Sequence, residues 1–180
     1  MPLTTYTSGE VLTAASLNAN FTFAAANPSS AVVQVKSAFK SDTFSTSSTS
    51  FVDVTGLSIA ITPTSATNKI LVMVTTNLAT DGSSTAIWAR LMRGATAIAI
   101  GDAAGSRTQA TLGAYPNGGV VITGAMTFLD SPATTSATTY KLQIQMNSAS
   151  TGYVNRNNSD ADLAAIARTV SSITVMEVTP

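Results

Sequence analysis

From residue 31 onward, short runs of apolar and polar residues alternate with a period of two, and this alternation restricts the fold more than any other feature. The clearest run is 140–147, in which Tyr140, Leu142, Ile144 and Met146 alternate with lysine, glutamine and asparagine. Successive side chains of a β-strand point to opposite faces, so such a run is typical of a strand with one buried face. Similar runs occupy residues 33–39, 57–61, 70–74, 87–92, 97–100, 120–130 and 173–178. The sequence thus predicts about eight to ten strands.

Short turn-forming segments separate these runs, and no helix of the kind that links parallel strands lies between them. The segment 93–95 is a tight link and predicts a hairpin between 87–92 and 97–100. Regularly spaced strands joined by turns predict an all-β fold, an antiparallel jelly-roll β-sandwich, for residues 31–180. Residues 160–168 fit either a helical turn or a loop that leads into the last strand.

Residues 1–30 follow a different pattern and predict a short helix. Thr13 is the expected N-cap, because a threonine hydroxyl accepts a hydrogen bond from a free N–H of the first turn. Leu12 and Leu17 have the spacing of a hydrophobic staple, Leu17 and Phe21 lie on one stripe, and Pro28 ends the helix. This stripe either packs on the β-domain or docks on another subunit or protein. The linker-like composition of residues 28–30 favours docking, which makes 1–30 an attachment segment.

The chain has no cysteine and no histidine, and its nine basic and nine acidic residues give a formal net charge of zero. These absences exclude disulfides, thiolate or imidazole metal ligands, cysteine nucleophiles and histidine bases. A neutral chain also lacks the basic surface that nucleic acid requires. No segment has the form of a signal peptide or approaches the roughly 20 apolar residues that span a membrane. We therefore expect no nucleic-acid partner, no membrane insertion, and assembly in a cytoplasm.

The acidic residues give little support for catalysis or metal binding. Asp160 and Asp162 form an Asp-x-Asp pair, but no glycine or glutamate follows at the spacing of a calcium loop, so a polar turn is favoured. Glu177 lies within an apolar strand, where we expect a solvent-facing or interface carboxylate paired with an arginine. No nucleophile elbow or phosphate-binding glycine loop is present. The sequence predicts a protein that is not an enzyme, with no catalytic residue, metal or cofactor.

Two loop segments carry the side chains best suited to contact a partner. Exposed tyrosine and asparagine stack on and hydrogen-bond to sugars or flat protein surfaces. The candidates are Tyr115, Asn117, Tyr153, Asn155 and Arg156. Ordinary turn chemistry explains the asparagines equally well.

The N-terminal segment 6–21 resembles the opening segment of tailed-bacteriophage fibre and appendage proteins. In those proteins a Gly-x-x-Leu-Thr-Ala-x-x-Leu-Asn-x-x-Phe stretch recurs near the end attached to the virion. The matching residues here are Gly9, Leu12, Thr13, Ala14, Leu17, Asn18 and Phe21. The resemblance implies that Gly9, Leu12, Thr13, Leu17, Asn18 and Phe21 anchor the chain to other virion proteins.

The segments 50–59, 62–63, 68–72, 89–94 and 171–178 resemble a phage virion β-domain. The resemblance implies a homotrimeric jelly roll located in the virion. One possibility is a tail fibre or spike whose β-domain contacts a host surface glycan or protein. The other is a head-fibre or capsid decoration protein. A third interpretation is a non-catalytic carbohydrate-binding module. The low charge content of 10% and the apolar residues on both faces of several strands also predict an oligomer, because a monomer would expose that surface.

Overall fold

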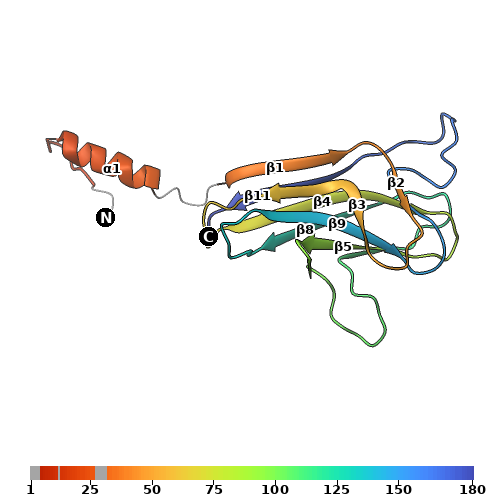
Figure 1. Cartoon of the computed structure of the whole chain (residues 1–180). Helices are drawn as coiled ribbons and strands as arrows, with labels where there is room; N and C mark the ends of the chain where they lie inside the picture. Colours follow the sequence, from red (N-terminus) through yellow and green to blue (C-terminus); the bar gives the residue numbers. More distant parts are fainter. Residues whose placement is uncertain (1–4, 12, 27–31) are drawn as a thin grey trace.

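The computed structural model describes residues 5–11, 13–26 and 32–180, and for 22–26 only the backbone. An N-terminal helix, α1 (Ala14–Ala26), precedes an all-β domain of two antiparallel sheets (Figure 1). This confirms the predicted all-β sandwich. The predicted helix end at Pro28, the linker 28–30 and the boundary at residue 30 lie outside the described residues.

The first sheet is built around one long central strand, β4 (Lys69–Thr80). Along one side of β4 lie β11 (Ser171–Val178) and β10 (Gly152–Val154), and these continue outward to β1 (Val32–Lys40) and β2 (Phe44–Thr46) respectively. The same residues of β4 also pair with β8 (Ile122–Asp130), which therefore lies on the other side. The resulting order across the sheet is β1, β11, β4, β8, with β2 and β10 extending it at one end.

The second sheet has the order β3, β9, β5, β6, and β7 also pairs with β5. Its strands are β3 (Val52–Ile61), β5 (Ile87–Arg93), β6 (Thr96–Ile98), β7 (Leu112–Ala114) and β9 (Thr138–Met146). The predicted hairpin is present, because β5 and β6 pair across the tight turn with Arg93 opposite Thr96. Residues 160–168, for which the sequence left two possibilities, form a loop with one turn rather than a helix.

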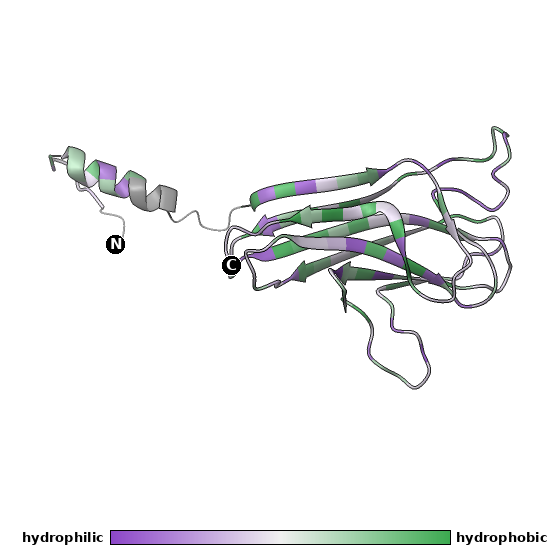
Figure 2. Cartoon of the chain, viewed as in Figure 1, coloured by the Kyte–Doolittle hydropathy of each residue, from purple (hydrophilic) through white to green (hydrophobic). Residues whose placement is uncertain are grey.

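The core lies between the two sheets and follows the alternation in the sequence. Val72 and Val74 of β4 and Leu142 and Ile144 of β9 are all buried, whereas the residues between them are only partly buried. Hydrophobic and hydrophilic residues alternate along the strands in the same way (Figure 2). Each fully buried side chain of this size contributes roughly 1.5–3 kcal/mol by leaving water. Burial of the apolar side chains that this pattern places on one face therefore contributes strongly to the stability of this domain.

Strand β1 differs from this pattern, because its large apolar residues are exposed. Val35 and Phe39 are 53% and 68% exposed, whereas Ala38 packs against the core and Lys40 is buried. The pairing with β11 fixes this orientation, since Val35 lies opposite the outward Met176. Among the described residues, no helix is both long and apolar enough to cross a bilayer.

Candidate functional site

The described part of the N-terminal segment contains a turn followed by a capped helix. The Thr7 N–H donates to the Glu10 carboxylate at 2.7 Å, and Gly9 adopts a φ of +95°, a backbone conformation that residues with a side chain rarely accept. The Ser16 N–H then donates to the Thr13 hydroxyl at 3.2 Å, which confirms the predicted N-cap. Two residues of the matched stretch, Gly9 and Thr13, thus have local structural roles at the start of the helix.

The two large apolar residues of α1 that the structure describes are exposed. Leu17 is 39% exposed and Phe21 is 66% exposed, and Asn18 also lies on the surface. Leu17 and Phe21 are four residues apart and share one side of the helix. Alanines occupy other sides as well, so the apolar residues are spread around the helix rather than confined to a sharp stripe. Leu12, the remaining anchoring candidate, lies outside the described residues.

A group of loops lies at the end of the sandwich opposite to the start of β1. Strand directions place residues 81–86, 115–121 and 155–170 there (Figure 1). We call this group the distal loops. The Tyr115 hydroxyl donates to the Ser84 carbonyl at 2.9 Å while the residue remains 59% exposed, and Asn117 is exposed beside it. These two candidate contact residues therefore lie on an accessible loop, with the ring of Tyr115 held in place.

Two other candidates are buried, and the prediction that they form an exposed contact loop is wrong. Tyr153 belongs to β10, between β2 and β4, and Asn155 has no exposed surface. The Arg156 guanidinium lies 4.1 Å from the centre of the Tyr153 ring and is partly buried. These three residues lie at the end of the first sheet, where the loop 155–170 begins. The sequence suggested exposure because asparagine and tyrosine near a Thr-Gly turn are typical of loops.

Asn155 connects four segments of the first sheet. Its amide nitrogen donates to the carbonyls of Lys40 at 2.8 Å and Asp42 at 2.9 Å, and its amide oxygen accepts from the Ser171 hydroxyl at 2.6 Å. Its backbone N–H donates to the Asn77 carbonyl at 3.0 Å. The residue has a φ of +65°, which asparagine tolerates better than most residues. It therefore fixes where the loop 155–170 leaves the sheet.

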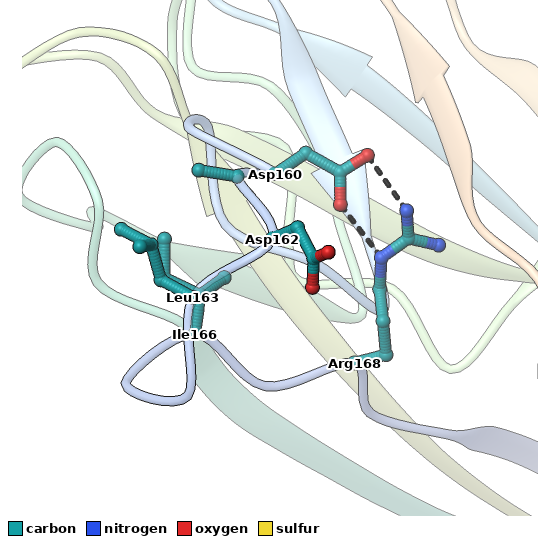
Figure 3. Close-up of a pocket in the computed structure, with 6 residues that line it drawn as sticks. Asp160, Asp162, Leu163, Ile166 and Arg168 are labelled. Carbon is teal, nitrogen blue, oxygen red and sulfur yellow. Dashed lines mark hydrogen bonds and ion pairs between the residues drawn. The ribbon is translucent and has the colours of Figure 1, made fainter.

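A surface hollow of about 350 Å³ lies on that loop, between its acidic and apolar residues (Figure 3). Arg168 forms a two-pronged ion pair with Asp160, with Nε 2.6 Å from one carboxylate oxygen and a terminal nitrogen 2.8 Å from the other. Arg156 lies 3.6 Å from the same carboxylate. Leu163 and Ile166 form the apolar wall. Because Asp160 is already neutralised by arginine, the Asp160–Asp162 pair acts as a polar turn in this geometry. Within the described part of the chain, no three potential metal ligands come together.

Glu177 is buried, and within the part of the chain that the structure describes its carboxylate forms no ion pair with an arginine, which corrects the prediction of a solvent-facing or arginine-paired carboxylate. One of its oxygens accepts hydrogen bonds from the Thr64 N–H and hydroxyl, both at 2.7 Å, and from the Asn68 amide at 2.6 Å. The other accepts from the Gln34 amide at 2.6 Å. Burial raises the pKa of Glu177, but these hydrogen bonds outweigh it and lower the pKa to about 2. This carboxylate fastens the loop after β3 to β1 and β11.

Asp130 is a second buried carboxylate and joins the two sheets. It accepts from the Tyr140 hydroxyl at 2.5 Å and from Arg93 at 2.8 Å. Burial, the hydrogen bond to Asp130 and the charge of Asp130 raise the pKa of Tyr140. Like Glu177, this group is used in structural contacts.

The chain matches no known protein-family model, and a comparison with curated proteins finds no matching sequence.

Proposed function

We propose that this chain is a structural protein of a tailed-phage virion, an appendage of the tail-fibre or spike type. Residues 1–30 attach it to the particle, and the β-domain contacts the host or a neighbouring virion protein. The observation that carries this proposal is the exposure of Leu17 and Phe21, which belong to the phage-like N-terminal stretch and lie on a helix that precedes the sandwich. Exposed apolar side chains at matching positions suit docking on another protein.

The order of the strands supports a jelly roll as the finer fold. One sheet runs β1, β11, β4, β8 and the other β3, β9, β5, β6, so the chain changes sheet between β3, β4 and β5 and again between β7, β8 and β9. A jelly roll contains two Greek keys folded into two such four-stranded sheets. We further propose that the subunit forms a homotrimer, in keeping with its low charge and the apolar residues on its surface.

The distal loops are the proposed contact surface. They lie at the end opposite to the start of β1, and therefore away from the point where the attachment segment joins the domain. Tyr115 offers an exposed aromatic ring and Asn117 an exposed amide. An aromatic face and an amide are the groups that bind sugars and flat protein surfaces, so the proposed partner is a host surface glycan or protein.

Particle incorporation tests the attachment role. Phe21→Asp places a charge at an anchoring position, and Ala19→Asp places the same charge at an exposed position of the same helix that the phage stretch leaves variable. We expect Phe21→Asp to reduce incorporation strongly and Ala19→Asp to incorporate nearly as the unmodified chain does. Equal incorporation of both variants would contradict the attachment role of Phe21.

Electron cryo-microscopy of the particle locates the protein directly. Copies at the tail support the appendage proposal. Many copies on the capsid would replace it by the decoration role, and absence from the particle would refute both. Glycan-array binding that is lost in Tyr115→Ala supports the distal loops as the contact surface, and binding unchanged by this substitution would move the contact elsewhere.

A further inference from the structure

The two outer faces of the sandwich differ in chemistry. On the outer face of β3, β9 and β5, Lys141 lies 2.7 Å from the Asp53 carboxylate, and Gln143 donates to the same carboxylate at 2.6 Å. Arg90 in turn donates to the Gln143 side-chain oxygen at 2.8 Å. A network of charges and amides of this kind is well solvated. This face therefore suits exposure to water.

The outer face of the other sheet, formed by β1, β11, β4 and β8, carries an apolar row instead. Strand pairing aligns one outward residue from each strand: Val35, Met176, Leu71 and Leu129. The two ends of the row, Val35 and Leu129, are 53% and 49% exposed. Four side chains in register across four strands form a continuous apolar strip on the surface.

The next two rows of this face contain no charge either. One consists of Ser37, Thr174, Met73 and Thr127, and the next of Phe39, Ser172, Thr75 and Ala125. The outward charged residue of β4 is Lys69, which lies beyond these rows at the end of the strand, beside Ser131. The face is thus uncharged over three consecutive rows, with apolar and hydroxyl groups only.

The size of the face is of the order that a stable contact needs. Four strands spaced about 4.8 Å apart and about nine residues long at 3.3 Å each project an area of roughly 600 Å². Side-chain relief increases the accessible area above this projection. A stable protein interface takes about 800 Å² from each partner, which is of the same order.

We propose that this face binds a second copy of the same chain. In a trimer the copies of a residue near the threefold axis face one another across that axis, so charges on a face turned towards the axis would bring like charges together. This face has none in its three rows, and the chain carries no net charge that would oppose association. The absence of cations in these rows also leaves nothing to attract phosphate groups of a nucleic acid or an anionic membrane. The proposal deepens the homotrimer of the proposed function and rests on that part of it.

A pair of charge-inserting variants of the full chain tests the face. Val35→Lys with Leu129→Lys changes the two half-exposed ends of the apolar row, outside the core. Ser58→Lys with Ala60→Lys adds the same charge at exposed positions on the opposite outer face. At micromolar concentration we expect light scattering to give three chains for the unmodified protein and the control, and one chain for Val35→Lys/Leu129→Lys.

Single-cysteine variants keep the test decisive if the lysine variant fails to fold, since the chain has no cysteine of its own. Ser37→Cys lies on the proposed face and Ser58→Cys on the other. We expect the thiol of Ser37→Cys to react with a polar disulfide reagent at least tenfold more slowly than the thiol of Ser58→Cys. An unmodified protein with the mass of one chain would overturn both this proposal and the homotrimer. A trimer in which the lysine pair or the thiol at position 37 behaves like its control would overturn the face alone.

Discussion

Replacing Glu177 by glutamine keeps the shape of a buried side chain and removes its charge. The carboxylate oxygen that accepts from Thr64 and Asn68 can be replaced by the amide oxygen. The new NH₂ group then faces the Gln34 amide nitrogen, which is also a donor and already donates to the Thr62 carbonyl at 2.8 Å. One buried donor therefore meets another, and the remaining hydrogen bonds lose their charged acceptor.

The hydrogen bonds and the pKa shift that they cause give the same size of effect. A hydrogen bond to a charged group contributes about 1.5–3 kcal/mol, so one lost bond and three weakened bonds predict a loss of about 2–4 kcal/mol. The pKa of Glu177 is lowered from 4.5 to about 2. At about 1.4 kcal/mol per unit this gives an upper limit of roughly 3 kcal/mol, and we expect about 2 kcal/mol because the glutamine oxygen keeps part of each hydrogen bond.

The pH dependence separates the charge from a simple packing defect. The folded-state pKa of Glu177 lies below its unfolded value, so its stabilisation is complete above pH 4.5 and is lost as the pH falls towards 2. Urea unfolding should show a gap of about 2 kcal/mol between the unmodified chain and Glu177→Gln at pH 7, and about half of it at pH 3. Asp42, Asp53 and Asp81, whose pKa values are also lowered, cancel because both proteins contain them.

Glu10→Gln is the matched control, since Glu10 is exposed in the N-terminal segment and contacts Thr7 rather than the sandwich. It should leave the unfolding free energy of the β-domain unchanged. A Glu177→Gln protein as stable as this control at pH 7, or a gap of equal size at pH 3, would refute the assignment of Glu177 as a charged fastening group.

Three further predictions concern the sandwich and its distal end. Asn155→Ala should lower the free energy of unfolding by about 3 kcal/mol or more, because it leaves buried donors and acceptors without partners and places alanine at φ +65°. In urea titrations Asn155→Gly should recover part of this loss, and equal stability of the two variants would contradict the contribution of backbone strain. Tyr140→Phe should cost about 1–3 kcal/mol by removing the donor to Asp130, measured by calorimetry against Tyr115→Phe, whose hydroxyl bond is exposed. Gly124→Ala should destabilise by about 1–3 kcal/mol in urea titrations because the new methyl group would overlap Leu112. Gly101→Ala is the control, since the nearest atom to its new methyl group is the Ala110 carbonyl oxygen at 3.9 Å, and equal stability of the two variants would contradict the overlap.

The local elements could be predicted from the sequence because their causes are local. The Thr13 cap depends on a hydroxyl and an N–H three residues apart, and the strands depend on alternation within a few neighbouring residues. The hairpin of β5 and β6 depends on the tight turn between the two strands, which is also a local feature. Of the candidate contact residues, Tyr115 and Asn117 were predicted as exposed loop residues and are exposed.

The buried polar residues could not be placed in this way. Glu177 meets Thr64 and Asn68 across more than one hundred positions of the chain, and Asn155 meets Lys40 across a similar distance. Neither set of contacts can be recognised from neighbouring residues in the sequence, because a polar residue within a strand or after a turn is equally compatible with exposure to solvent. Their roles depend on which loops the two sheets bring together.

The sequence by itself determined that the chain after residue 31 contains many strands with two unlike sides, preceded by a capped helix with Leu17 and Phe21 on one stripe. Alternation indicates that each strand has one apolar and one polar side, but it does not indicate which side another sheet covers. Only the tertiary structure decided this for β1, where pairing with β11 turns Ala38 inward and leaves Val35 and Phe39 on the surface. The physical reason is that burial is a property of the assembled sheets, whereas strand formation is a property of neighbouring residues.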